Sequence, residues 1–216
     1  VALTPLEVWL GTAEDGVATA HVDDLEDWAV YKKSSVTGLP SNSVSGIAYD
    51  PLQGTVIVAT DRGLAVFQGG HFDVELAGAD VHAACAGTEA VAGLRTFAAA
   101  DTGVYGRDDT GQWSRVVADP AVANARAITV WEGALWIGTD NGLYAWDGST
   151  LSPVDATSGY SVASLGVGPG LKYGGPVLWV GTQARPDNDQ GNGYVIAVFE
   201  VVKVDVVERH GGPDLE

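Results

Sequence analysis

The chain has 216 residues, enough for one large all-β domain with a sizeable core. Hydrophobic residues make up 46% and charged residues only 18% of the sequence, which argues against a disordered protein. The 28 Asp and Glu residues exceed the 11 Lys and Arg residues, giving a net charge of −17, and a field of that sign repels nucleic acids and anionic membrane surfaces. We therefore expect a small molecule, a glycan or a protein as the partner, with no nucleic acid. The oligomeric state is left open.

A single cysteine, Cys85, excludes a disulfide within the chain. It lies in the apolar stretch 81–86, which predicts a buried structural thiol rather than a nucleophile. No apolar run approaches 18 residues, so we expect no insertion into a membrane.

Five segments repeat one pattern: a short apolar strand with a large residue, a small residue, a polar turn, and then Gly with another apolar residue. The large residues are Trp9, Ile57, Phe97, Trp136 and Trp179. The small residues that follow stand at 11, 59, 99, 138 and 181, so the repeats are 48, 40, 39 and 43 residues apart. This is the length of a four-stranded propeller blade.

The turns of the repeat have the chemistry of tight hairpins. Asp61-Arg62-Gly63, Asp101-Thr102-Gly103 and Asp140-Asn141-Gly142 each separate two apolar runs. Gly tolerates a positive φ and Asp bonds its own backbone, so these sequences favour a two-strand reversal. The large residues hold one position of the repeat, and we expect them to pack between neighbouring blades.

The sequence thus predicts an all-β fold, a β-propeller of about five four-stranded antiparallel blades. In chain order we expect a single propeller domain over 1–216, with blades at approximately 1–36, 37–78, 79–119, 120–158 and 159–210. The first blade is expected to lack its inner strand, because residues 1–5 are too few for an ordinary one. The run 194–207 favours β-structure but has no clear turn signal, so its strands are not assigned.

The second repeat resembles a known family. Gly38-Leu39-Pro40-Ser41-Asn42-Ser43-Val44, followed by Ile47, Asp50, Gly54, Ala59-Thr60 and Gly63-Leu64, is similar to the two-component-regulator propeller repeat, and the segment 135–148 matches it well. The resemblance implies a sensory or ligand-facing propeller that is not itself catalytic. It also implies a periplasmic or extracellular location.

The inner strands and the loops entering them are expected to line a central channel, where ligands find concave sites with converging polar groups. The polar candidates there are Asn42, His82, Asn124, Arg126 and Tyr160. Simple structural roles are open for these residues too: the two Asn residues can close turns, and His82 can be a core histidine.

One inserted loop, 183–193, contains carboxylate and amide oxygens from Asp187, Asp189 and Asn192. Such oxygens are the ligands that Ca²⁺ prefers, but the loop lacks the EF-hand pattern, so a solvated loop is the leading interpretation and Ca²⁺ the alternative. No other cofactor is indicated.

The sequence contains no nucleophile elbow, phosphate loop or paired metal-ligand His motif, and no catalytic residues are assigned. We expect a non-catalytic recognition propeller of the sensor type. Two alternatives stay open: a metal-assisted lyase or hydrolase acting on a sugar or lactone in the channel, and a structural blade array of a larger assembly.

Overall fold

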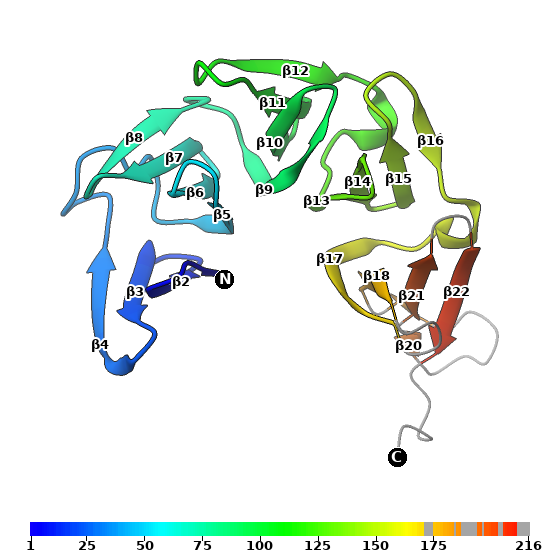
Figure 1. Ribbon diagram of the computed structural model, residues 1–216, viewed down its shortest axis with the longest axis horizontal. Helices are drawn as coiled ribbons and strands as arrows, with labels where there is room; N and C mark the ends of the chain where they lie inside the picture. Colours follow the sequence, from blue (N-terminus) through cyan, green and yellow to red (C-terminus); the bar gives the residue numbers. More distant parts are fainter. Residues whose placement is uncertain (171–174, 184, 187–193, 196, 203–204, 211–216) are drawn as a thin grey trace.

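The computed structural model describes residues 1–170, 175–183, 185–186, 194–195, 197–202 and 205–210. Its fold consists of five four-stranded antiparallel sheets arranged side by side along an arc (Figure 1). In each sheet neighbouring strands pair in chain order, and in the fifth sheet the pair β19–β20 comes between β18 and β21 along the chain. This confirms the predicted propeller class.

The strands of the five sheets are as follows: β1 (Ala2–Leu3), β2 (Glu7–Gly11), β3 (Val17–His21) and β4 (Asp24–Tyr31) in the first; β5 (Val44–Asp50), β6 (Thr55–Thr60), β7 (Gly63–Gln68) and β8 (His71–Glu75) in the second; β9 (Val81–Val91), β10 (Leu94–Ala100), β11 (Gly103–Arg107) and β12 (Trp113–Val117) in the third; β13 (Ala127–Trp131), β14 (Ala134–Thr139), β15 (Gly142–Trp146) and β16 (Leu151–Pro153) in the fourth; β17 (Val162–Pro169), β18 (Pro176–Thr182), β21 (Ala197–Val202) and β22 (Asp205–His210) in the fifth. The short strands β19 (Arg185–Pro186) and β20 (Tyr194–Val195) pair with each other between β18 and β21. Two 3₁₀ turns, η1 (Pro120–Val122) and η2 (Asp155–Thr157), precede the fourth and fifth sheets.

The first sheet has only a minimal inner strand. The sequence predicts that an ordinary one is missing, and the structure has at this position the two-residue strand β1, which pairs antiparallel with β2 through Ala2 and Leu3. The inner strands β5, β9, β13 and β17 of the other sheets have 7, 11, 5 and 8 residues, so the inner strand of the first sheet is the shortest of the five.

The second strand of each sheet sends alternate side chains to the two neighbouring sheets, because side chains along a strand point to opposite faces. Ile57 and Ala59 face the third sheet, whereas Val56 and Val58 face the first. The large residue of the repeat therefore always packs against the following sheet: Trp9, Ile57, Phe97 and Trp136 each lie in the cluster shared with the next sheet and are at most 8% exposed.

The small residue two positions further on allows the next inner strand to come close. A Cβ atom at Gly138 would lie 2.5 Å from Cγ1 of Val162, and one at Gly11 would clash in the same way with Val44. Because Val44 and Val162 stand near the start of the inner strands of the following sheets, the glycine and the large residue together fit one sheet onto the next.

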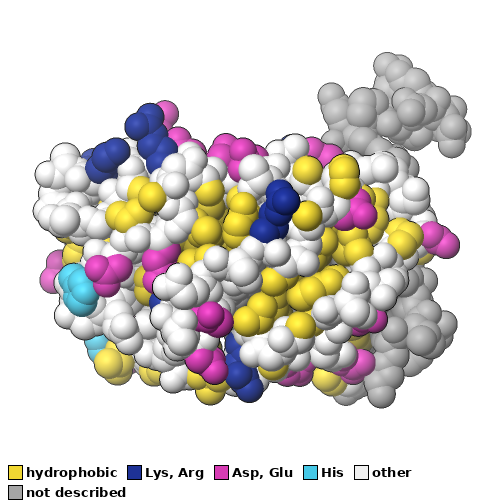
Figure 2. Space-filling model, turned by 90° about the horizontal axis from the view of Figure 1, so that it is seen from above, with side chains coloured by type: hydrophobic (Ala, Val, Ile, Leu, Met, Phe, Trp, Pro, Cys, Tyr) yellow, Lys and Arg dark blue, Asp and Glu magenta, His cyan; other side chains and the backbone are white. Residues whose placement is uncertain are grey.

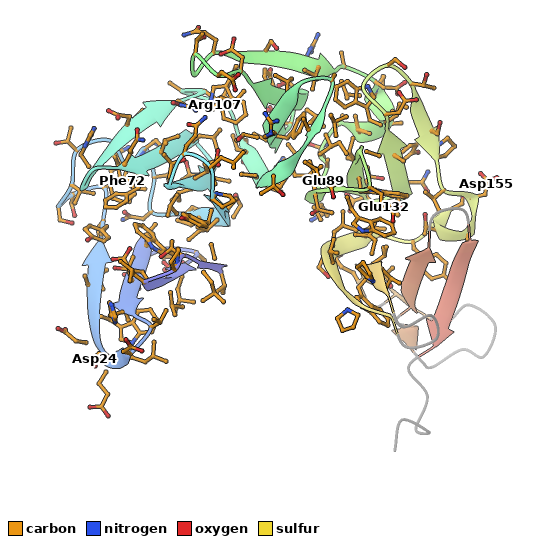
Figure 3. All side chains as sticks on the ribbon, viewed as in Figure 1. Asp24, Phe72, Glu89, Arg107, Glu132 and Asp155 are labelled. Atoms are coloured by element: carbon orange, nitrogen blue, oxygen red, sulfur yellow. The ribbon has the colours of Figure 1, made fainter. Side chains whose placement is uncertain are left out.

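An ion pair adds a polar contact between the second and third sheets. Arg107, labelled where these sheets meet in Figure 3, donates to both carboxylate oxygens of Glu75 at 2.8 and 3.0 Å. The indole of Trp113 donates to the same carboxylate at 2.5 Å, and the two charged side chains are only 14% and 18% exposed. The bond to Glu75 raises the pKa of Arg107, which therefore stays charged.

Replacing Trp136 by Ala should lower the free energy of unfolding by about 3–5 kcal/mol, since it removes a buried aromatic side chain from the interface between two sheets. Urea denaturation followed by circular dichroism measures this loss. The matched control is Trp28→Ala on the outer strand β4, where the ring is half-buried, with an expected loss of about 1 kcal/mol. Equal losses in the two variants would contradict the packing scheme.

Candidate functional site

The inner strands β5, β9, β13 and β17 line the concave side of the arc (Figure 1). Close to the start of each stands a buried or half-buried apolar residue of the core between sheets, namely Val44, Val81, Ala125 and Val162. In β5, β9 and β17 the residue directly after it is skipped in the pairing with the next strand, which marks a β-bulge, and in the fourth sheet that residue directly precedes β13. These following residues are Ser45, His82, Arg126 and Ala163.

The four following residues meet at one cavity of about 250 Å³. Gln183, just after the end of β18, completes its lining. The cavity thus draws side chains from the second, third, fourth and fifth sheets, and it lies where the inner strands begin. This convergence makes it the candidate binding site.

The cationic group of this site is held in place by a carboxylate. Arg126 donates through Nε and Nη2 to Asp140, the latter bond measuring 3.0 Å, and Ser161 donates to Asp140 at 3.0 Å. The bond from Arg126, with a smaller contribution from Ser161, lowers the pKa of Asp140. The bond to Asp140 in turn raises the pKa of Arg126. Because only two of the five N–H groups of the guanidinium bind Asp140, others are left to bind a ligand or water.

His82 supplies a second polar group to the same cavity. Its Nδ1 lies 3.9 Å from the carboxylate of Asp80, and its Nε2 is buried with no hydrogen-bond partner in the described part of the chain. The neighbouring Ser45 hydroxyl is already engaged, since it donates to the carbonyl oxygens of Val81 at 2.5 Å and Ala59 at 3.2 Å. A buried ring nitrogen without a partner is costly, so His82, which lines the cavity, has hydrogen-bonding capacity that is not used within the described part of the chain.

Of the five residues predicted from sequence, the structure brings His82 and Arg126 together at this cavity. Asn42 lies in the connection between the first and second sheets, where its side chain accepts a bond from the backbone N–H of Lys33 at 2.7 Å. Asn124 is exposed in a turn with φ at 60°, and Tyr160 is half-buried against the core between the fourth and fifth sheets. The structure does not place these three in the lining of the cavity.

Three lining residues, Ser45, Ala163 and Gln183, are not among the residues predicted from sequence. Ser45 occupies the same repeat position as His82 and Ala163, directly after the apolar residue of the inner strand, so aligning the repeats on that residue would have found it. Gln183 carries no comparable signal, because it belongs to the inserted loop after β18.

The proposed calcium ligands Asp187, Asp189 and Asn192 lie outside the described residues. Within the described residues, no group of three or more His, Cys, Asp or Glu side chains is arranged to hold a metal ion. Acidic side chains are scattered over the outer surface of the arc (Figure 2). Among the described helices, none has the length and apolar character to cross a membrane.

A larger cavity of about 430 Å³ lies between the first and second sheets. Its lining includes Trp9, Tyr49 and Phe67, with Glu7 and His21 at the polar side. The Glu7 carboxylate already accepts the indole N–H of Trp9 at 3.0 Å. This cavity receives side chains from two sheets only, whereas the smaller one receives them from four.

No protein-family model matches the chain, and no curated protein is similar to it in sequence. Solved structures do share its fold. Two structures of the extracellular domain of BT4673 from B. thetaiotaomicron, a putative one-component or hybrid two-component system, match 99% and 98% of this chain with TM-scores of 0.66 and sequence identities of 17% and 18%. This chain spans about a third of their length, 35% in both cases.

Two further structures complete the comparison. A streptogramin B lyase matches 96% of this chain, which covers 77% of the lyase, with a TM-score of 0.61 and 14% identity. The β-propeller domain of Cps50 (Swd1) from Myceliophteria thermophila matches 100% of this chain, which covers 69% of that domain, with a TM-score of 0.54 and 17% identity. At these identities the likeness shows the fold alone: the chain has a β-propeller fold, as the repeat predicts.

Asp140→Asn should reduce stability at neutral pH, by about 0.2–1 kcal/mol, because half of this ion pair is exposed to solvent. The pKa of Asp140 is lowered by folding, so the carboxylate stabilises the fold above its ordinary pKa of about 3.9 and this contribution is lost as the pH falls through the lowered value. Urea denaturation at pH 7 and at steps down to pH 3 measures the difference between the two proteins. A difference that grows toward acid pH would contradict this assignment.

Cys85 should be unreactive in the folded protein. It pairs with Phe97 across β9 and β10 and packs against the core between the third and fourth sheets, and burial raises the pKa of its thiol to about 12. At pH 8 almost no thiolate is present in the folded protein, so a disulfide reagent should detect no thiol before denaturation. After denaturation the same reagent should detect one thiol per chain. Fast titration of the native protein would show that the thiol is accessible.

Proposed function

We propose that this chain is a non-catalytic recognition module of the sensor type, which binds a small polar ligand at the cavity between the starts of the inner strands. The observation that carries the proposal is the meeting of His82, Arg126 and Gln183 from three different sheets around one cavity of about 250 Å³.

The charges around this cavity define the ligand class. Arg126 is compensated by Asp140, so the site as a whole is close to neutral, and the net charge of −17 disfavours a polyanion. The remaining guanidinium N–H groups donate, while Nε2 of His82 and the Gln183 amide donate or accept. This set suits an uncharged or singly anionic molecule with several hydroxyl groups and at most one carboxylate in excess of its cationic groups, such as a sugar, a sugar acid or an amino acid.

The mode of use follows from the kind of protein that shares the fold. The extracellular domain of BT4673 belongs to a putative one-component or hybrid two-component system, and the repeat motif of this chain resembles the propeller repeat of such regulators. We propose by analogy that this chain also works outside the cytoplasm, as a sensing part of a larger protein or complex.

The test is a binding screen of monosaccharides, sugar acids and amino acids, read first by thermal shift and then by calorimetry. Arg126→Ala and His82→Ala should each weaken the binding of a hit by about 10- to 100-fold, the equivalent of one hydrogen bond to a charged or otherwise unpaired buried group.

Arg115→Ala is the matched control. This arginine lies on the outer strand β12, where it donates to the carbonyl oxygen of Thr102 at 3.2 Å, far from the cavity lining. Its replacement should leave the affinity unchanged. A hit that binds all three variants as well as the unmodified chain would place the binding site elsewhere and refute the proposal.

A further inference from the structure

The two ends of the arc carry sheet faces that have no neighbouring sheet. Figure 1 shows the first sheet (β1–β4) and the fifth sheet (β17–β22) at the two feet of the arc, with the open part of the arc between them. Within the described residues, the second, third and fourth sheets each have a neighbouring sheet on both sides.

The face at the start of the arc repeats an interface that is buried elsewhere. Val8 and Leu10 stand at the repeat position of Val56 and Val58, which are at most 3% exposed against the first sheet, yet Val8 and Leu10 are only half-buried. The same face bears Leu3, which pairs with Val8 and is 65% exposed.

On the outer part of this face the pattern continues. Val30 pairs with Ala18, which pairs with Leu10, and Val30 is 50% exposed. A hollow of about 340 Å³ is lined in part by Ala18 and Val30. In the interior of the arc, the corresponding face receives the large residue of the preceding sheet.

The face at the end of the arc presents the complementary half of the same interface. Leu178 and Val180 face the fourth sheet and are fully buried, so Trp179 between them points away from it. Trp9, Ile57, Phe97 and Trp136, at the same repeat position, are at most 8% exposed, whereas Trp179 is half-buried. Gly181 stands at the repeat position of Gly11 and Gly138, and a Cβ atom there would clash with Oγ of Ser164 in its own sheet instead of with a valine of a following inner strand.

We propose that these two faces are seats for further propeller-repeat sheets, linked to the sheets described here, which complete a ring. The incoming sheet beyond the fifth presents an apolar inner strand to Trp179 and Gly181, and the one before the first presents its large residue to Val8 and Leu10. This goes beyond the ligand site and is independent of it.

Two observations favour linked sheets over a second copy of the chain. The opening between the two end faces is smaller than the arc itself, so a second arc of five sheets does not fit between both faces (Figure 1). In addition, the lyase and the Cps50 propeller domain, which match 96% and 100% of this chain, are longer than it, since the match covers only 77% and 69% of them.

The test compares the 216-residue chain with versions extended at the C-terminus by one, two or three copies of its own repeat 120–158. One of these versions should have the number of sheets that closes the ring. In that version the melting temperature should rise by at least about 10 °C above that of the 216-residue chain, because both apolar end faces become buried. The fluorescence of an apolar dye such as ANS, which reports exposed hydrophobic surface, should fall at least fivefold in the same version.

Single variants separate this result from general stabilisation. In the 216-residue chain, Trp136→Ala should lower the melting temperature much more than Trp179→Ala, and in the closed version the two should lower it to the same extent. Leu10→Asp should be tolerated in the 216-residue chain but abolish the gain from extension.

Three results would overturn the proposal. The first is an unchanged melting temperature and dye signal at every copy number. The second is weak dye binding by a 216-residue monomer, which would mean that the faces are already covered. The third is a 216-residue dimer in light scattering that Leu10→Asp dissociates, because a second copy would then occupy the seats.

Discussion

The packing of one sheet against the next is the constraint on which the whole structure depends. A single four-stranded sheet with two apolar faces is unstable in water unless both faces are covered, and here each sheet covers its neighbour. One large residue and one small residue per repeat define the contact, as Trp136 and Gly138 do against Val162. The same rule that stabilises the interior of the arc leaves Val8 and Trp179 half-exposed at its ends.

The candidate site is a by-product of this packing. A β-bulge near the start of β5, β9 and β17 leaves one residue unpaired directly after the residue that enters the core between sheets, and this unpaired residue lines the cavity. His82 lies in β9, whereas Arg126 directly precedes β13 and its backbone N–H donates to the carbonyl oxygen of Gly138 at 2.8 Å, so two different sheets hold these residues in place. The Arg126–Asp140 pair fixes the guanidinium further, so the scaffold keeps its polar groups preorganised, which favours recognition.

Repetition also explains how much of the site could be predicted. His82 and Arg126 were identifiable because each is a polar residue next to an apolar strand start, and Ser45 shares that register. Asn42 and Asn124 look equally polar in the sequence, but their roles are set by backbone bonds and turn conformation, as the bond from Lys33 to Asn42 and the positive φ of Asn124 show. Composition alone does not separate a turn-forming Asn from a ligand-binding one.

The sequence by itself determined the class of fold, the number of sheets and the position of the packing residues, because a motif recurring every forty or so residues imposes one local geometry each time. Tertiary structure alone decided which polar residues share a cavity, how Gln183 joins them, and that the arc stays open between the first and fifth sheets. These features depend on the small rotation from one sheet to the next, which accumulates over the arc and which no single repeat encodes.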